Sequence, residues 1–444
     1  MDRLILSLFA ILLFIMPISG TIALKNILIS VLIVALLVNF LKNSLYRELK
    51  SYDKRLLRIV FALFIFLLYA LLHSIYLSED SEWSLRHYRG HLFYPAVYFL
   101  TGMLLANFAS NSRRISARTV ITVLFLSMFI HVFYIDLVAL DRLWNSGVMT
   151  RRYGGLIQHI TAANYVTNIL LAIIVSEFLY RLRMKKNILL FSNGVLYLLL
   201  ALCIFSTFIE ALRLGDITLV FLGIGSAIIF LYKNNTRSRW VRNTIAIGLF
   251  VILSVPLAYN IHSDPRWAKL IETIPLAVNT SNSQHWLDRR FEPPKTESGY
   301  EVKGSNYERI AWAAKSLEYI YEDPIGIGYS KNSLGRAFDK RYQGDTKGEY
   351  GGANAHSAIL TLALGVGIPG VLLWFLFVYF VIKGSIVNLE KSYSYFSILS
   401  LFIITGLLSR SFVDENMVDH IFQQYMIILG VVLMFMVGEK NENK

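Results

Sequence analysis

The 444-residue chain is poor in charge and in cysteine. Charged residues make up 16% of it and hydrophobic residues 55%, whereas about a quarter of an ordinary soluble domain is charged. A soluble fold could not bury so much apolar surface, and this composition also excludes a disordered, collagen-like or coiled-coil chain. The single cysteine, Cys203, lies in an apolar run. An intrachain disulfide and a cluster of thiolate ligands are therefore both excluded.

The sequence also lacks the motifs of several common catalytic centres. It contains no His-Glu-x-x-His or Asp-x-Asp metal motif, no Gly-x-x-x-x-Gly-Lys phosphate loop and no Gly-x-Ser-x-Gly nucleophile elbow. Each of these motifs places ligands or nucleophiles at a spacing that its chemistry requires. We therefore expect a protein that uses no metal, nucleotide or other cofactor, and that has no nucleic-acid partner.

Long apolar runs account for most of the chain. Because about 20 residues of helix cross the hydrocarbon core of a bilayer, they predict an all-α polytopic membrane protein with about twelve transmembrane helices. The predicted spans are 4–19, 22–41, 56–77, 92–108, 119–140, 161–180, 188–209, 215–232, 244–262, 357–382, 393–409 and 421–438. We expect residues 1–262 to hold nine spans, residues 263–355 to form one large polar loop, and residues 356–444 to hold three spans. Helical periodicity within the loop predicts short helices at 264–278 and 306–322.

Lysine and arginine cluster in alternate short loops, at 42–55, 109–118, 181–187, 233–243 and 383–392. Loops with such clusters usually remain in the cytoplasm. The pattern predicts that both termini are cytoplasmic and that the large loop is periplasmic.

Arginine is nevertheless abundant on the side predicted to face outward. These arginines are Arg86, Arg89, Arg142, Arg151, Arg152, Arg213 and Arg410, with Arg266, Arg289, Arg290, Arg309, Arg336 and Arg341 in the large loop. Snorkelling or pairing with lipid phosphates would account for any one of them. Because the guanidinium fork suits phosphate oxygens, the whole set indicates a site for a polyanion at the membrane surface, such as a diphosphate-linked lipid or a phosphorylated glycolipid.

Three positions stand out as candidate site residues. Arg213 lies in a short break between two apolar runs, where an ionisable residue is usually functional, although Glu210 and Asp216 offer simple neutralisation. His356 follows a glycine-rich stretch at 350–355 and precedes a predicted span, and His159 follows Arg151 and Arg152. Histidine transfers protons near neutral pH. The predicted spans contain almost no acidic residues, which argues against a transporter.

Four segments resemble motifs of the O-antigen ligase/polymerase superfamily. Residues 355–372 contain His356, a small polar residue, an apolar helix and a Gly-Ile-Pro-Gly turn at 367–370. Residues 307–329 resemble the family's stretch of arginine, helix, proline and Gly-x-Gly, and residues 153–164 its earlier glycine-rich motif. Arg213 resembles the arginine of a Ser-Arg-Gly motif, here Leu-Arg-Leu, and Ser357 stands where the family usually has asparagine.

The resemblance implies a glycosyltransferase of the bacterial inner membrane that works on the periplasmic face. Its members take a glycan from undecaprenyl diphosphate. Ligases pass it to lipid A-core, polymerases to another carrier-linked repeat, and a third branch to protein Ser or Thr. We expect the ligase reaction, with inversion at the anomeric carbon and with surrounding membrane lipids as further contacts. The alternatives are the polymerase, the protein O-oligosaccharyltransferase and, outside enzymes, a transporter of lipid-linked glycan.

The expected roles follow from this chemistry. His356 is the general base, and Arg213 and Arg309 are the principal contacts of the diphosphate. The remaining expected substrate-binding residues are Arg152, Arg89, Arg86 and His159.

Overall fold

The computed structural model describes residues 2–42, 53–231, 266–296, 299–302, 304–342, 353–392 and 394–438, with isolated positions between 240 and 255. Within them the regular elements are helices, apart from one isolated bridge between Lys295 and Glu301. The helices are α1 (Asp2–Ile15), α2 (Ile22–Lys42), α3 (Lys54–Tyr76), α4 (Ser81–Tyr88), the π-helix η2 (Arg89–Phe93), α5 (Tyr94–Asn111), α6 (Ala117–Ser146), the 3₁₀-helix η3 (Gly155–Ile157), α7 (Ile160–Met184), α8 (Asn193–Glu210), α9 (Arg213–Leu231), α11 (Arg266–Val278), α12 (Gly304–Glu322), α13 (Ser333–Arg341), α14 (Ala358–Ser392), α15 (Tyr395–Ser411) and α16 (Asp419–Gly438). The predicted all-α class is confirmed.

Eight helical stretches among the described residues are long and apolar enough to cross a membrane. They are α2, α3, the continuous stretch Ser81–Asn111, α6, α7, α8, α14 and α16. The apolar helices α9 and α15 are shorter, and α1 has 14 residues. The predicted span 244–262 lies outside the described residues except at isolated positions, so the number twelve stays a prediction. The protein is a multi-pass membrane protein.

The centre of the bundle is a close contact between α5 and α16. A Cβ on Gly102 would lie 2.1 Å from the carbonyl oxygen of Ile427, and a Cβ on Gly430 would lie 2.1 Å from the carbonyl oxygen of Phe99. Because neither glycine has a side chain, the backbones of the two helices come into direct contact. Small residues commonly bring membrane helices together in this way. Helices α2 and α6 pack on α5, and α15 packs on α16.

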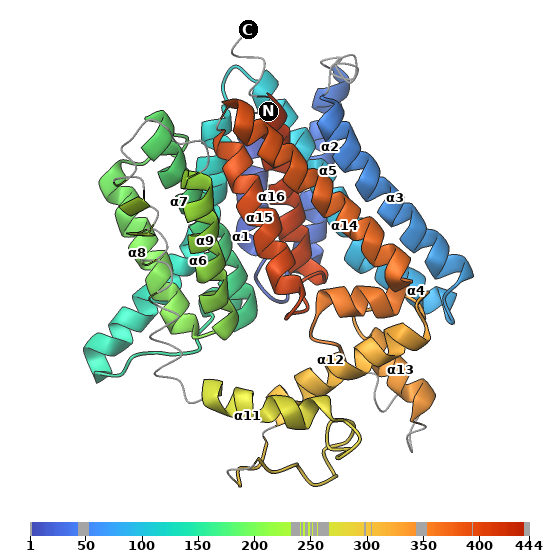
Figure 1. The fold of residues 1–444 in the computed structure, drawn as a ribbon. Helices are drawn as coiled ribbons and strands as arrows, with labels where there is room; N and C mark the ends of the chain where they lie inside the picture. The colour runs from blue at the N-terminus through green and yellow to red at the C-terminus, as the bar shows by residue number, and fades with distance from the viewer. Residues whose placement is uncertain are drawn as a thin grey trace.

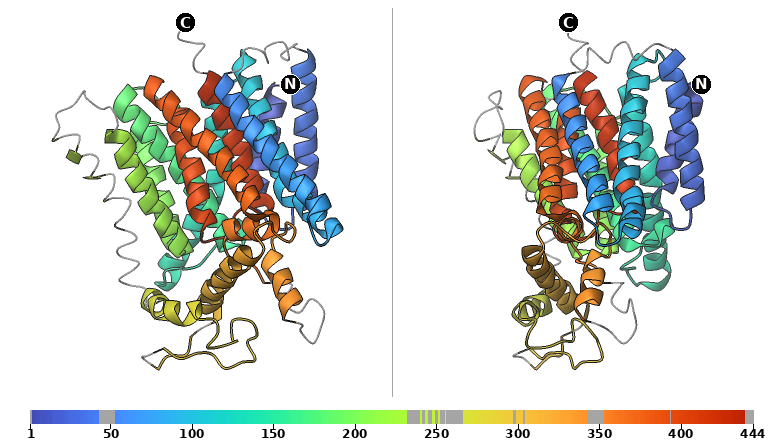
Figure 2. Two further views of the ribbon diagram at one scale, coloured as in Figure 1. Left: turned by 45° about the vertical axis from the view of Figure 1, so that its right-hand side comes forward. Right: turned by 90° about the vertical axis from the view of Figure 1, so that its right-hand side faces the viewer.

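The two ends of the bundle differ. The side chain of Asp2 accepts a hydrogen bond from Ser112 at 3.0 Å, and Gly438 lies beside Ser110. The start of α1, the end of α5 and the end of α16 therefore share one end. Helices α11, α12 and α13 cover the opposite end (Figures 1 and 2). This arrangement agrees with the predicted separation of the large loop from both termini.

The layer at that opposite end has a small core of its own. Trp286, Tyr307, Ala311 and Phe338 are buried in it, together with Leu364 from α14. The helices predicted at 264–278 and 306–322 are present as α11 and α12. Because its core extends into α14, the layer is joined to the membrane bundle rather than forming a separate domain.

Helix α14 is bent at Gly367, where φ is 72° and ψ is 179°. A Cβ at this position would lie 2.1 Å from the carbonyl oxygen of Ile325, so only glycine fits both the conformation and the space. The N–H of Ile327 and that of Gly328 donate to the carbonyls of Leu364 and Gly365, each at 2.9 Å. Residues 358–366 consequently lie across the end of the bundle (Figure 1). The predicted span 357–382 falls, apart from Ser357, within the apolar stretch Ala358–Glu390, which is long enough to cross a membrane; the sequence did not predict the bend inside it.

Candidate active site

His356 lies in the segment 353–357 that leads into α14, at the end of the bundle covered by α11–α13. Its φ is +48°, a left-handed conformation that is uncommon for a residue with a side chain. Its backbone N–H donates to Oδ1 of Asn354 at 3.0 Å. Its imidazole stacks on the ring of Trp312, with centroids 5.7 Å apart and planes 3° from parallel. The turn and the stack together fix where the ring points.

Helix α12 supplies both the stacking partner and a cation. Arg309 and Trp312 are three residues apart and so share one face of the helix. Arg309 is exposed, and the neighbouring carboxylate of Glu308 is instead bound by Arg289 through two hydrogen bonds of 2.6 and 2.9 Å. Within the described residues Arg309 forms no ion pair. It remains available to an anionic ligand.

The pKa of His356 is lowered to about 4, first by burial and then by the charge of Arg309. A lowered pKa means that the imidazole stays neutral until the pH falls close to 4. A neutral imidazole at ordinary pH can accept a proton from a ligand. The electrostatics of the site thus keep His356 in the unprotonated form that a general base requires, at the cost of lower basicity.

The connection between α15 and α16 holds the start of α14. The N–H of Ala358 donates to the carbonyl of Asp414 at 3.0 Å, and the Ser357 hydroxyl donates to the carbonyl of Ser411 at 3.1 Å. Thr361 donates to a carboxylate oxygen of Glu415 at 2.6 Å. Burial raises the pKa of Glu415 to about 8, so this side chain is mostly protonated at neutral pH.

Asp414 also joins His356 to a polar network inside the bundle. Its carboxylate accepts from the hydroxyl of Tyr165 at 3.0 Å and pairs with Arg410 at 3.4 Å. Arg410 is 2% exposed, lies 3.7 Å above the Tyr165 ring and donates to Asn164 at 2.9 Å. Asn164 in turn donates to Glu210 at 2.6 Å. Arg410, which the sequence places among the outward cations, is therefore a buried structural residue.

The turn that carries Arg213 adjoins this network. Arg213 begins α9, and its side chain lies outside the described residues. Two residues later, a Cβ on Gly215 would lie 2.5 Å from Nδ2 of Asn164. The N–H of Arg152 donates to the carbonyl of Ile209 at 2.6 Å, which brings the exposed Arg152 to the end of α8. Two of the predicted phosphate contacts thus belong to one neighbourhood.

The remaining predicted residues lie elsewhere. His159 is exposed at the start of α7, within electrostatic range of His420 at the start of α16. Arg86 and Arg89 line a separate cavity beside α4. The contacts among the described residues therefore join His356 to Arg309 but do not join it to these three.

Some residues of this neighbourhood were not found from the sequence. Asp414, Glu415 and Asn164 contact the site from segments far from His356 along the chain. The only available signal was an acidic pair directly after a predicted span, which by itself also fits an ordinary solvated loop.

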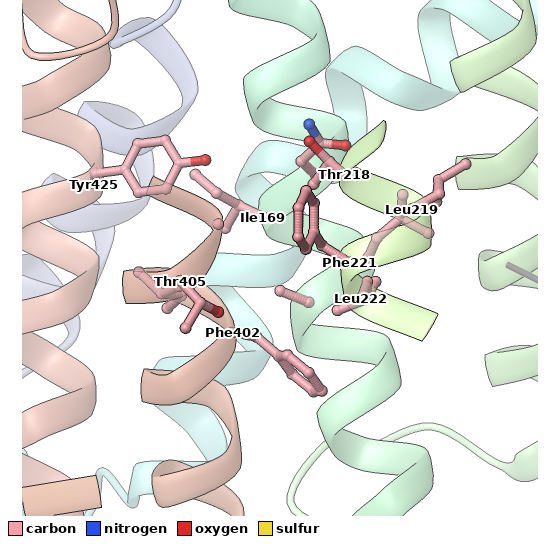
Figure 3. A pocket seen from close by; sticks show the side chains of 13 residues that line it. Ile169, Thr218, Leu219, Phe221, Leu222, Phe402, Thr405 and Tyr425 are labelled. Atoms are coloured by element: carbon pink, nitrogen blue, oxygen red, sulfur yellow. The ribbon is translucent and has the colours of Figure 1, made fainter. Parts of the chain in front are cut away.

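A small cavity of about 30 Å³ lies deeper in the bundle, between α7, α9, α15 and α16 (Figure 3). Its polar lining includes Asn168, Thr218, Thr405 and Tyr425. A space of this size holds a water molecule or two but no sugar ring. This cavity is therefore too small for a glycan. Among the described residues, no three His, Cys, Asp or Glu side chains are grouped as metal ligands.

Residues 197–375 match the family model described as O-Antigen ligase. This region of the chain is similar to the O-antigen ligase family. The matched region extends from α8 into α14 and contains Arg213, Arg309 and His356. This superfamily consists of membrane enzymes of the glycosyltransferase type that act on lipid-linked glycans. No curated protein matches the chain significantly.

The stacked Trp312 provides a first test of the site. Trp312→Ala removes the surface that positions and buries the His356 ring, so we expect the transfer rate to fall by about tenfold. The pKa of His356 should also rise toward its ordinary value, because burial is the main cause of its lowering. Rates measured from pH 4 to 8 report both effects.

Trp312→Phe is the matched control, since it keeps an aromatic face and should keep most of the rate. Thermal melts of both variants show whether each is folded. A wild-type rate and an unchanged pH profile for a folded Trp312→Ala protein would contradict the positioning role.

Proposed function

We propose that this protein transfers an O-antigen polysaccharide from undecaprenyl diphosphate to lipid A-core, with inversion at the anomeric carbon, on the periplasmic face of the bacterial inner membrane. The observation that carries the proposal is a neutral His356 stacked beside an unpaired Arg309 at the end of the bundle opposite both termini. The family match supports a lipid-linked glycan as donor. Residues 263–355, including α11–α13, would then be the periplasmic segment.

In this reaction an acceptor hydroxyl attacks the anomeric carbon of the donor sugar. His356 takes the hydroxyl proton as the new C–O bond forms, and the carrier diphosphate leaves with the electrons of the broken bond. General-base assistance of this kind contributes about 10² to 10⁴-fold. Because one displacement occurs, the configuration at the anomeric carbon is inverted.

The leaving diphosphate gains negative charge in the transition state. Cations aimed at it stabilise the transition state more than the bound donor, which is what accelerates the reaction. We assign Arg309 and Arg213 to this role, with Arg152 beside the Arg213 turn as a further phosphate contact and His159 as an outer substrate contact. The chemistry proposed here uses side chains alone, with neither metal nor nucleotide.

The function is tested by reconstitution of the purified protein with undecaprenyl-diphosphate-linked polysaccharide and lipid A-core. Ligated lipopolysaccharide should form without nucleotide sugar. Lipopolysaccharide gels of a deletion strain separate the branches. Loss of ligated chains with carrier-linked polymer accumulating supports the ligase, whereas core capped with single repeats would mean a polymerase. Absence of transfer from the carrier-linked polysaccharide to lipid A-core would overturn the proposal.

The pH dependence follows from the lowered pKa of His356. The neutral base persists down to about pH 4, so the transfer rate should stay level from pH 8 to near pH 5 and then fall as the imidazole is protonated. His356→Ala should abolish transfer but leave carrier-lipid binding nearly intact. His356→Gln keeps a polar group that cannot serve as a base, so near-normal turnover in that variant would make His356 a positioning residue only.

The two principal arginines should not tolerate lysine. A lysine ammonium keeps the charge but cannot bind two phosphate oxygens through a planar fork. We expect Arg213→Lys and Arg309→Lys to lose nearly as much activity as the alanine variants, about tenfold or more. Steady-state rates at saturating acceptor measure this loss, and full activity of both lysine variants would show that net charge alone suffices.

A further inference from the structure

A second cavity lies at the edge of the bundle, well away from His356. Its volume is about 540 Å³, and it opens between α3, α4 and η2. Leu71, Leu85, Tyr88 and Phe93 form its apolar walls. The sequence predicts an outward loop at 78–91, but the structure has a helix and a π-turn there. The cavity exists because these elements fold back beside the end of α3.

The polar rim of this cavity is cationic. Its charged lining consists of Arg86, Arg89 and Glu82. Arg86 pairs with Glu82 at 3.2 Å, but both side chains are largely exposed, and such pairs contribute little. No carboxylate in the described part of the chain pairs with Arg89. A net positive charge therefore faces the opening.

The local backbone sets where Arg89 projects. The π-helix η2 begins at Arg89, directly after α4 ends at Tyr88. Single π-turns inside α-helices occur often at functional sites. The extra residue in such a turn changes the direction in which the following side chains point. Here the turn leaves Arg89 exposed at the cavity. His91, two residues later, is buried, and its Nδ1 lies 3.4 Å from a carboxylate oxygen of Asp419.

An apolar surface leads to the cavity from within the membrane. Helix α3 packs on α14 with one face and lies at the edge of the bundle (Figure 1). Its other face carries exposed side chains at helical spacing, namely Leu57, Phe61, Phe64, Leu68, Leu72 and Ile75. Such a stripe faces acyl chains in a membrane protein. A lipid lying along it would place its headgroup at the arginine rim.

The same cavity is connected to His356 by the first part of α14. The residues at the bend contact α3, since the Tyr69 hydroxyl donates to the carbonyl of Val366 at 3.1 Å. His356 lies at the other end of residues 358–366. At about 1.5 Å per residue this helix spans roughly 13 Å. An acceptor lipid held at the cavity would need its glycan to extend along this helix to reach His356.

We propose that the cavity lined by Arg86 and Arg89 binds a phosphate of the acceptor glycolipid, with its acyl chains along α3 and its sugars directed toward His356. The inference rests on the proposed function and assigns the acceptor to a site separate from the donor diphosphate. Apolar walls beneath a cationic rim match a phosphorylated lipid, whereas a free phosphate would gain nothing from the stripe on α3.

The test compares Arg86→Gln/Arg89→Gln with Arg113→Gln/Arg114→Gln in the full-length protein. The control removes two equally exposed arginines near Ser112, at the opposite end of the bundle. Native mass spectrometry of protein in phosphatidylcholine nanodiscs measures binding of lipid A-core, of enzymatically dephosphorylated lipid A-core, and of phosphatidylglycerol.

We expect the wild type and the control to bind lipid A-core more tightly than the other two lipids. The cavity variant should lose about tenfold or more of this binding. In transfer assays, the KM for the acceptor should rise by a similar factor, while kcat and the KM for the donor stay unchanged. Arg89→Lys in the Arg86→Gln background should restore part of the binding.

Three results would overturn the proposal: unchanged binding in the cavity variant, equal binding of dephosphorylated lipid, or equal binding of phosphatidylglycerol, which would mark an ordinary anionic-lipid contact. Because the binding measurement requires no turnover, failure of the proposed reaction would be seen separately as absent transfer with binding retained.

Discussion

The ion pair between the buried Arg410 and the partly buried Asp414 is the interaction on which the site depends. Removing two charges from water is costly, and the structure offsets this cost by surrounding the pair with Tyr165 and Asn164. Loss of one partner from such a pair typically destabilises by about 3 to 5 kcal/mol, because the other charge is left buried. The same Asp414 holds Ala358 through its backbone carbonyl. One polar network thereby joins the membrane bundle to the segment that carries His356.

The first part of α14 is fixed at both ends by backbone contacts. Ala358 is bound at one end, and the bend at Gly367 is pressed against Ile325 at the other. A tilt of the helix between these points would break the hydrogen bonds that Leu364 and Gly365 accept from Ile327 and Gly328. The uncommon backbone conformation of His356 is sustained in this setting, which is where such strain is usually found.

The sequence predicted the parts of the fold that the bilayer dictates. Apolar length and helical periodicity placed most membrane helices, and also α11 and α12, because both depend on local sequence alone. The bend of α14 was missed. Gly367 and Pro369 predict a turn, but the direction of the bend depends on the long-range contact with Ile325, which the sequence does not reveal.

The sequence pointed to candidate site residues only where a residue type stands in an unusual position, such as an arginine on the side predicted to face outward. His356 and Arg309 were found from the family motifs and the excess of outward arginine, and the structure brings them together. Asp414 was missed because a long-range backbone hydrogen bond to Ala358 is what brings it to the His356 segment. Arg410 illustrates the opposite limit, since its position suggested a ligand contact and only the three-dimensional structure shows its buried partners.

The reciprocal contact of Gly102 and Gly430 has a mechanical consequence. With backbones touching, α5 and α16 cannot slide or splay without losing their whole interface, so they form a stiff spine that ends beside the segment holding Asp414. Edge helices such as α2, whose apolar side chains are mostly exposed, lack that constraint on their lipid-facing side. When the bilayer thickens or thins, the edge helices can tilt to follow it, while the spine keeps the reacting groups at a constant depth. The candidate site is thus partly insulated from the lipid composition of the surrounding membrane.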